Sequence, residues 1–299
     1  MGLLLEQKRD SGGVLDLGRR SVEELRRFTV KRPVGAFALA LVLMLVFLAV
    51  FAPVVSPYDP LVQHSDAVME APDTHFLFGT DYFGRDILSR VIYGARISLT
   101  VGIASVALGL AAGVLIGLVT AYVGGATDIL VQRLMDAALA FPGLIFALAI
   151  VTALGPRLIT VILAIGFTAI PRNNRVVRGS VLAEKNNLYV TAAGASGCSQ
   201  WRIMWRHILP NVAAPIIIIG ATELGAAILL EASLSFLGVG VPPPSPSWGS
   251  MLSGEYRTYM LAAPWMAFFP GVAISLAVLG WNLLGDALRD AWDPRLRGS

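Results

Sequence analysis

Six apolar runs constrain the fold of this chain more than any other feature of its sequence. They are residues 34–55, 97–123, 129–154, 158–170, 212–237 and 265–284. A helix of roughly 20 apolar residues crosses the ~30 Å hydrocarbon core of a bilayer, and all of the runs except 158–170 reach that length. Because lipid offers no partner to unpaired backbone groups, each run is expected to be helical. The sequence therefore predicts an all-α, polytopic membrane protein with six transmembrane helices.

The composition supports a membrane location and argues against a nucleic-acid partner. Of the 299 residues, 56% are hydrophobic and only 14% are charged, whereas a soluble domain has about 25% charged residues. The formal net charge is only +3. The basic residues lie beside the apolar runs, where placement on the inner side of a membrane explains them. We therefore expect the chain to be surrounded by lipid and to bind no nucleic acid.

The distribution of Lys and Arg predicts the orientation, because cytoplasmic connections carry an excess of these residues. Six spans put both termini on one side, which then holds eighteen Lys and Arg against five on the other side. We expect both termini in the cytoplasm. Residues 1–33 would form a cytoplasmic tail, followed by a membrane domain of residues 34–299. Residues 56–96 and 238–264 would pack as a cap over the outer end of the helices.

A polar segment, residues 172–211, separates the fourth and fifth apolar runs. It is too charged to cross a bilayer, and it has an excess of basic residues over the single acidic Glu184. The basic residues are Arg172, Arg175, Arg178, Lys185, Arg202 and Arg206. This excess predicts a cytoplasmic loop.

Part of this loop resembles the "EAA loop" of ABC importer permeases. The family motif is Glu-Ala-Ala, three residues, Gly, nine residues and a short apolar stretch that ends in Leu-Pro. Here the corresponding residues are Tyr189, Thr191, Ala192, Ala193, Gly197, His207, Leu209 and Pro210. The resemblance implies that these residues form a short helix that docks into a groove on a separate ATPase subunit. Thr191 departs from the pattern because it replaces the family's Glu, which removes a carboxylate that would pair with an Arg of the ATPase.

Three further stretches extend the resemblance to the dipeptide, oligopeptide and nickel permeases. Phe78-Gly79-Thr80-Asp81 with Gly84-Arg85-Asp86 is similar to the segment that opens their second span. Residues 231–238 with 246–249 resemble the end of their fifth span, and residues 282–295 resemble their C-terminal sequence. The closest resemblance is to the second of the two permease subunits.

The resemblance implies an ABC type I importer permease fold in a bacterial inner membrane. It also implies a homologous permease subunit, two cytoplasmic ATPase subunits or domains, and an extracytoplasmic substrate-binding protein as partners. ATP and Mg would be used by the ATPases, and this chain would bind no cofactor and would not be an enzyme on its own. Di- or oligopeptides are the expected substrates. Nickel, haem and glutathione remain alternatives within the same family.

Sites with their own chemistry are few. The chain has no Gly-x-x-x-x-Gly-Lys-Ser/Thr loop for ATP, and its three histidines do not form a metal site. Glu223 and Glu231 lie in the fifth run, where carboxylates are costly and usually face protein or water. For each of the two carboxylates there are two interpretations. It lines the translocation pathway and meets a peptide's amino group, or it has a structural role. A secondary transporter that uses these carboxylates for ion coupling is the rival interpretation.

Gly109, Gly113 and Gly117 recur every four residues in the second run. Such a stripe of small residues lets two helices approach closely. Both static packing and a helix that slides during transport are compatible with it.

Overall fold

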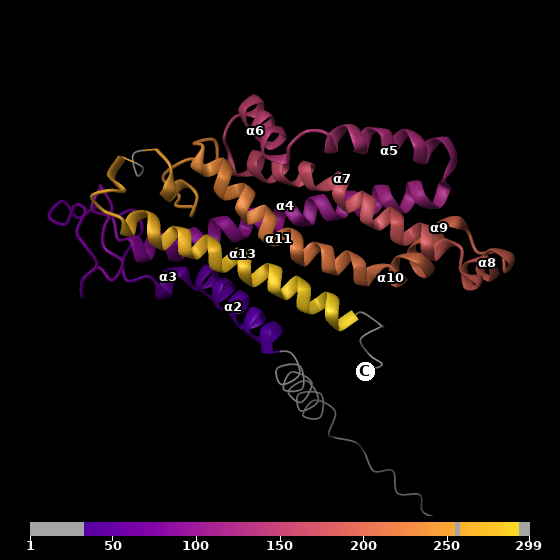
Figure 1. The fold of residues 1–299 in the computed structure, drawn as a ribbon, viewed down its shortest axis with the longest axis horizontal. Coiled ribbons are helices and arrows are strands. Elements are labelled where there is room, and N and C mark those ends of the chain that lie inside the picture. Colours follow the sequence, from indigo (N-terminus) through magenta and orange to yellow (C-terminus); the bar gives the residue numbers. More distant parts are fainter. Residues whose placement is uncertain (1–32, 255–257, 293–299) are drawn as a thin grey trace, which may run out of the picture.

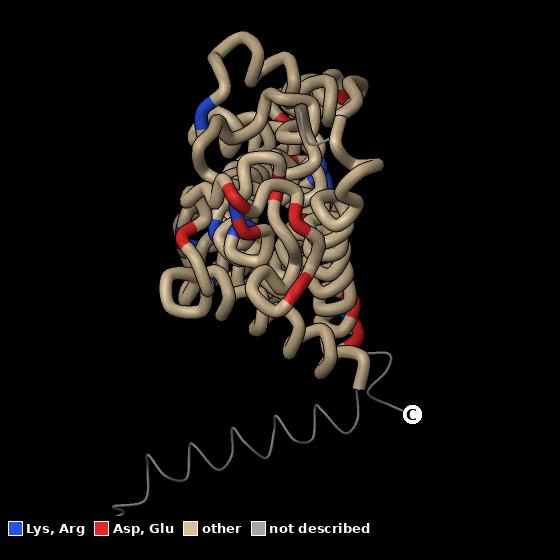
Figure 2. Tube along the Cα trace, turned by 90° about the vertical axis from the view of Figure 1, so that its left-hand side faces the viewer, with Lys and Arg blue, Asp and Glu red and all other residues tan. Residues whose placement is uncertain are grey.

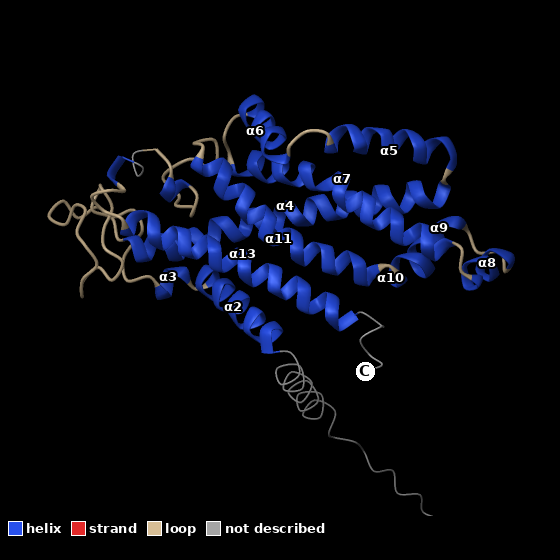
Figure 3. Cartoon of the chain, in the orientation of Figure 1, coloured by secondary structure: helices blue, strands red, loops and turns tan. Residues whose placement is uncertain are grey.

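The computed structural model describes residues 33–254 and 258–292, and within these ranges the chain is built from helices and loops without a strand (Figures 1 and 3). The longer helices are α2 (Pro33–Val50), α4 (Ile87–Val123), α5 (Gly125–Leu139), α6 (Gly143–Leu154), α7 (Leu158–Lys185), α11 (Ala213–Phe236) and α13 (Trp265–Trp292). The shorter ones are α3 (Ala52–Val55), α8 (Leu188–Ala195), α9 (Gln200–Arg202), the π-helix η1 (Ile203–Ile208), α10 (Leu209–Asn211) and the 3-10 helix η2 (Ser250–Leu252). The predicted N-terminal tail, residues 1–33, lies outside the described residues apart from Pro33.

Among the described helices, four are long and apolar enough to span a membrane, namely α2, α4, α11 and α13. The pair α5 and α6 adds a fifth candidate if it is counted as one broken span, because the two helices meet at a bend of 89°. The protein is thus a helical, multi-span membrane protein. The predicted number of six spans exceeds these four or five candidates. The predicted fourth span, 158–170, is part of α7, which continues into a charged segment and is therefore not apolar enough to be counted.

Two predicted boundaries differ from the structure. The run 129–154 is not one helix, because α5 ends at Leu139 and α6 begins at Gly143. Pro142 explains the break, since it lacks an N–H group and disfavours the helical conformation in the preceding residue. Conversely, Pro171 does not end α7, which continues to Lys185. The part of α7 beyond Pro171 is held by packing, because Val177 and Val181 are fully buried.

The helices α4 and α13 are also longer than the apolar runs indicate. Helix α4 begins at Ile87, ten residues before the run, because Asp86 caps it by accepting a hydrogen bond of 2.7 Å from the backbone N–H of Ser89. Helix α13 extends to Trp292 and therefore passes the predicted end at residue 284.

The long helices lie side by side, and their connections gather at two opposite ends (Figure 1). The connections 56–86, 237–254 and 258–264 are at one end, and α8, α9 and α10 are at the other. The start of α2 and the end of α13 point toward the α8 end. Figure 2 looks onto the end with the longer connections, where acidic and basic positions are interspersed among uncharged ones.

Two tryptophans, one of them fully buried, join the longer connections to the ends of α4 and α13. Trp248 is 1% exposed, and its indole N–H donates to the carbonyl of Val91 at 2.9 Å. The indole N–H of Trp265 donates to the carbonyl of Thr80 at 3.1 Å. Both bonds join parts of the chain that are far apart in the sequence, so this end of the molecule is held together by tertiary contacts.

Helix α4 lies at the centre and meets α7 along the glycine stripe. A Cβ atom added at Gly109, Gly113 or Gly117 would lie 2.7, 2.6 or 2.9 Å from the nearest atom of α7. Real Cβ atoms do not approach other atoms so closely. The stripe is therefore required for the contact between these two helices.

Candidate coupling element and membrane cavity

The predicted docking residues of the motif form one compact element at the end of the molecule, comprising α8, α9, η1 and α10 (Figure 1). Within α8, Val190 is buried, whereas Leu188 is 87% exposed. Thr191 and Ala192 are exposed, and Ala193 is partly buried. Helix α8 thus holds one face against the bundle and presents the other to a partner or to water.

Gly197 closes this helix by its backbone conformation. Its φ of +80° is in the left-handed region, which suits glycine. The N–H of Cys198 donates to the carbonyl of Ala193 at 3.1 Å, and that of Gly197 to Gly194 at 3.0 Å. These two bonds form a Schellman C-cap. A Cβ at Gly197 would meet nothing within 4 Å, so the glycine is needed for its φ angle and not for space inside this chain.

Tyr189 connects α8 to both neighbouring segments. Its hydroxyl lies 2.6 Å from an oxygen of Glu184 and donates to it, and it accepts a hydrogen bond of 3.2 Å from the side-chain amide of Asn211. The same amide donates to the carbonyl of His207 at 2.6 Å. Partial burial and the nearby Glu184 carboxylate raise the pKa of Tyr189 to about 12. The hydroxyl therefore stays a proton donor at physiological pH.

Glu184 and Asn211 were not among the predicted docking residues. Asn211 directly follows the Leu-Pro that ends the motif, which was a signal in the sequence. No comparable signal marked Glu184. It reaches the hydroxyl of Tyr189 only because α7 continues past Pro171 to Lys185.

His207, Leu209 and Pro210 lie where the short helices lead into α11. Pro210 offers no N–H to the carbonyl of Arg206, and its ring crowds that carbonyl. The wider π turn η1, Ile203–Ile208, relieves this crowding directly before it. Leu209 is partly buried and Pro210 is exposed.

An apolar cluster lies beneath the element and connects it to the long helices. It joins α8 and η1 to the ends of α4 and α7. Its buried members are Leu118, Ala121, Val177, Val181, Val190, Ile203, Met204, Ile208 and Val212. Because packed side chains transmit displacement, a displacement of α8 would be passed to α4 and α7 through this cluster.

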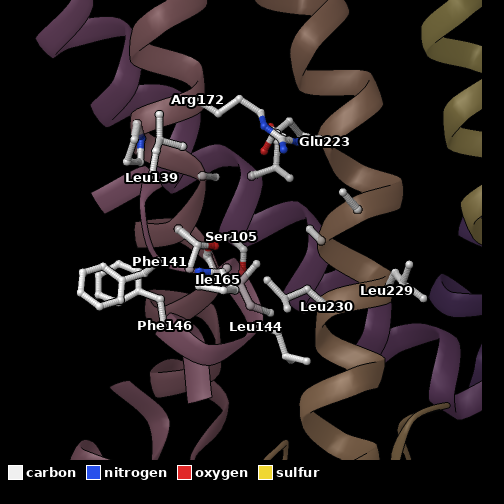
Figure 4. A pocket seen from close by; sticks show the side chains of 18 of the residues that line it. Ser105, Leu139, Phe141, Leu144, Phe146, Ile165, Arg172, Glu223, Leu229 and Leu230 are labelled. Atoms are coloured by element: carbon white, nitrogen blue, oxygen red, sulfur yellow. Dashed lines mark hydrogen bonds and ion pairs between the residues drawn. The ribbon is translucent and has the colours of Figure 1, made fainter. Parts of the chain in front are cut away.

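A cavity of ≈ 520 Å³ lies between the α5–α6 bend, α7 and α11 (Figure 4). Glu223, on α11, lines it and is 8% exposed. Its Oε1 atom lies 3.6 Å from Nη1 of Arg172, on α7. This oxygen has no hydrogen-bond partner among the described residues. Sequence reasoning missed Arg172 as a partner because it assigned that residue to the cytoplasmic loop.

Glu231 lies elsewhere and does not line this cavity. It is fully buried, and its carboxylate accepts hydrogen bonds from the hydroxyls of Ser98 at 2.9 Å and Ser235 at 2.7 Å. Ser98 is on α4, so the carboxylate ties α11 to α4. Both partners are serines, Ser98 of α4 and Ser235 of α11.

These features define a multi-span membrane protein with a charged pair in a cavity and a helical element at one end. Over residues 113–298 the chain matches the family model "Binding-protein-dependent transport system inner membrane component". Over residues 24–72 it matches the "N-terminal TM domain of oligopeptide transport permease C". The chain therefore belongs to the ABC importer permeases of this family, which are multi-span proteins of the bacterial inner membrane and are not themselves enzymes.

Curated relatives agree with this family over most of their length. The chain is 44% identical over 267 residues to the di/tripeptide transport system permease protein DppC of Pseudomonas aeruginosa, covering 87% of this chain and 88% of the relative. It is 40% identical to the dipeptide transport system permease protein DppC of Alkalihalophilus pseudofirmus, covering 89% and 88%. It is 41% identical to the glutathione transport system permease protein GsiD of Pectobacterium atrosepticum, covering 91% and 90%. The predicted family is thus confirmed.

Proposed function

We propose that the chain forms half of the translocation pathway of an ATP-driven importer for di- or oligopeptides. In this proposal it pairs with a homologous permease, and two ATPase subunits or domains bind on the cytoplasmic side. A substrate-binding protein delivers the peptide from outside. Both termini lie in the cytoplasm, in agreement with the excess of Lys and Arg in the segments assigned to that side. Six transmembrane helices are counted if α7 and the pair α5 and α6 each make one span.

The observation that carries the proposal is the projecting element around α8, with Gly197 as its cap. ATP binding closes the ATPase dimer, and α8 moves with it. Because the apolar cluster links α8 to α4 and α7, this movement shifts the long helices between inward-open and outward-open states. ATP biases the two states only if the ATPase binds α8 differently in each.

Peptide is favoured as the substrate because relatives at 40% and 44% identity are named as dipeptide and di/tripeptide permeases. Glutathione is the second candidate, because a relative at 41% identity is named as a glutathione permease. Glutathione is itself a small peptide-like molecule with free amino and carboxylate groups, so the same pathway chemistry serves both.

Uptake by the complete complex tests the proposal. The permease pair, the ATPases and the binding protein are reconstituted in proteoliposomes, and the uptake of labelled dipeptide, glutathione and Ni²⁺ is measured. We expect uptake of dipeptide that requires ATP and the binding protein. Uptake driven by an ion gradient in the absence of the ATPase would contradict the proposal and favour a secondary transporter. ATP-driven uptake of Ni²⁺ alone would keep the importer and exclude the peptide substrate.

A further inference from the structure

We propose that Arg172 and Glu223 together form a binding site for a zwitterionic substrate, in which Glu223 receives a free ammonium group and Arg172 a free carboxylate. The inference rests on the proposed function and assigns its substrate selectivity inside the membrane to two residues of this chain. Both residues line the ≈ 520 Å³ cavity, and in Figure 4 they lie next to each other at one end of it.

The contact between the two charged groups is incomplete in the empty cavity. The Nη1–Oε1 distance of 3.6 Å is that of an ion pair but is too long for a hydrogen bond. The exposed fractions differ strongly, at 67% for the Arg172 side chain and 9% for the Glu223 side chain. A buried carboxylate oxygen without a hydrogen bond is unfavourable, so Glu223 gains from a donor that enters the cavity.

The other groups of the cavity offer little competition for a charged ligand. Arg172 and Glu223 are the only charged residues among those described that line it. The hydroxyls of Ser105, Thr168 and Ser233 donate to the backbone carbonyls of Ile162, Ile165 and Leu229, at 3.1, 2.7 and 2.8 Å. The remaining lining is largely apolar. An apolar cavity of this size with few converging polar groups is typical of a small-molecule site.

A zwitterion fits this arrangement better than a ligand with one charge. A cation alone would pair with Glu223 but would be repelled by the neighbouring Arg172 guanidinium. An anion alone would pair with Arg172 but would be repelled by the Glu223 carboxylate. A substrate with both groups pairs each end with its opposite charge, through charge-assisted hydrogen bonds.

The site also links binding to the helices. The pair joins α7 to α11 on the α8 side of the cavity, because Ala226–Ser233 of the lining run along α11 away from α8. A substrate that occupies both partners separates the two side chains and removes this link. The element around α8 packs on α7 through the apolar cluster and leads into α11 through α10, so substrate and ATPase act on the same two helices.

Uptake by the reconstituted complex with modified peptides tests the inference. The probes are dialanine, N-acetyl-dialanine, which lacks the ammonium group, and dialanine amide, which lacks the carboxylate. For each probe, uptake by Glu223→Gln and Arg172→Gln is divided by wild-type uptake with the same binding protein, so that the selectivity of the binding protein cancels. We expect Glu223→Gln to lose roughly tenfold in dialanine uptake and much less with N-acetyl-dialanine. Arg172→Gln should lose roughly tenfold with dialanine and much less with the amide.

Matched controls lie one helical turn away. Arg175, also on α7, pairs with Asp136 of α5 at 2.7 Å outside the cavity lining. Arg175→Gln and Asp136→Asn remove the same charges and should leave the ratios between probes unchanged. If the glutamine variants fail to assemble, Arg172→Lys and Glu223→Asp retain the charges with a different reach and should shift the same ratios to a smaller extent.

The outcomes separate this inference from the proposed function. If the wild type takes up none of the three probes, the peptide substrate is wrong and this site is wrong with it. If the wild type takes up dialanine and the variants lose all three probes in parallel, the pair is structural and only this inference is wrong. Unchanged uptake of every probe in both variants would also overturn it.

Discussion

Replacing Gly197 by valine is expected to abolish ATP-coupled uptake while the membrane helices remain folded. The φ of +80° at this position is unfavourable for a β-branched residue. The Schellman cap of α8 would therefore be lost, and α8 would no longer hold the orientation in which a partner binds it. In proteoliposomes we expect uptake to fall to background, with ATP hydrolysis no longer stimulated by the loaded binding protein.

Gly197→Asn is the matched control, because asparagine tolerates the left-handed conformation better than other residues with a side chain. A Cβ at this position meets no atom of the chain within 4 Å. We therefore expect the asparagine variant to keep most of its uptake. Wild-type uptake by the valine variant would show that the cap is not required for coupling. Equal loss in both variants would point to a steric requirement of the ATPase groove.

Gly113→Leu is expected to have the largest effect on stability. A Cβ at this position would lie 2.6 Å from Cβ of Asn173 and 3.0 Å from the backbone nitrogen of Asn174. Backbone atoms cannot move aside as a flexible side chain does, so α4 and α7 would have to separate. Overpacking of this kind typically lowers the free energy of unfolding by about 1–3 kcal/mol, and we expect a value at the upper end. The measurement is the thermal unfolding midpoint of the purified complex in detergent.

The same substitution at Gly179 is the control. Gly179 lies on α7 like the residues that Gly113 contacts, but a Cβ there would meet nothing within 4 Å. Gly179→Leu should therefore leave the midpoint unchanged or raise it slightly, because leucine favours helix more than glycine does. If Gly113→Leu unfolds at the wild-type temperature, the close contact between α4 and α7 is not present in the protein.

Much of the architecture could be predicted because membrane helices appear in the sequence as apolar runs. The apolar run at 212–237 and the helix α11, Ala213–Phe236, nearly coincide. The close approach of α4 to another helix followed from the glycine spacing, although α7 as the partner did not. The family was predicted from short motifs and is confirmed by the match over residues 113–298.

The interruptions and extensions of helices were harder to predict, because a proline has opposite outcomes in different surroundings. Pro142 breaks a helix at an exposed bend, whereas Pro171 is buried and the helix continues through it. Only the tertiary packing distinguishes the two. The prediction that the helix ends at Pro171 also placed Arg172 in a cytoplasmic loop. A residue in such a loop is not considered as the partner of a carboxylate in the membrane.

Labelling of Cys198 tests whether the element around α8 is the cytoplasmic docking site for the ATPase. Cys198 is the only cysteine of the chain and directly follows Gly197. A membrane-impermeant maleimide is applied to intact right-side-out cells, to inverted vesicles, and to inverted vesicles stripped of the ATPase. We expect no labelling in intact cells, slow labelling in inverted vesicles and faster labelling after the ATPase is stripped. Rapid labelling from outside intact cells, or a rate in inverted vesicles that does not change when the ATPase is removed, would contradict this docking site.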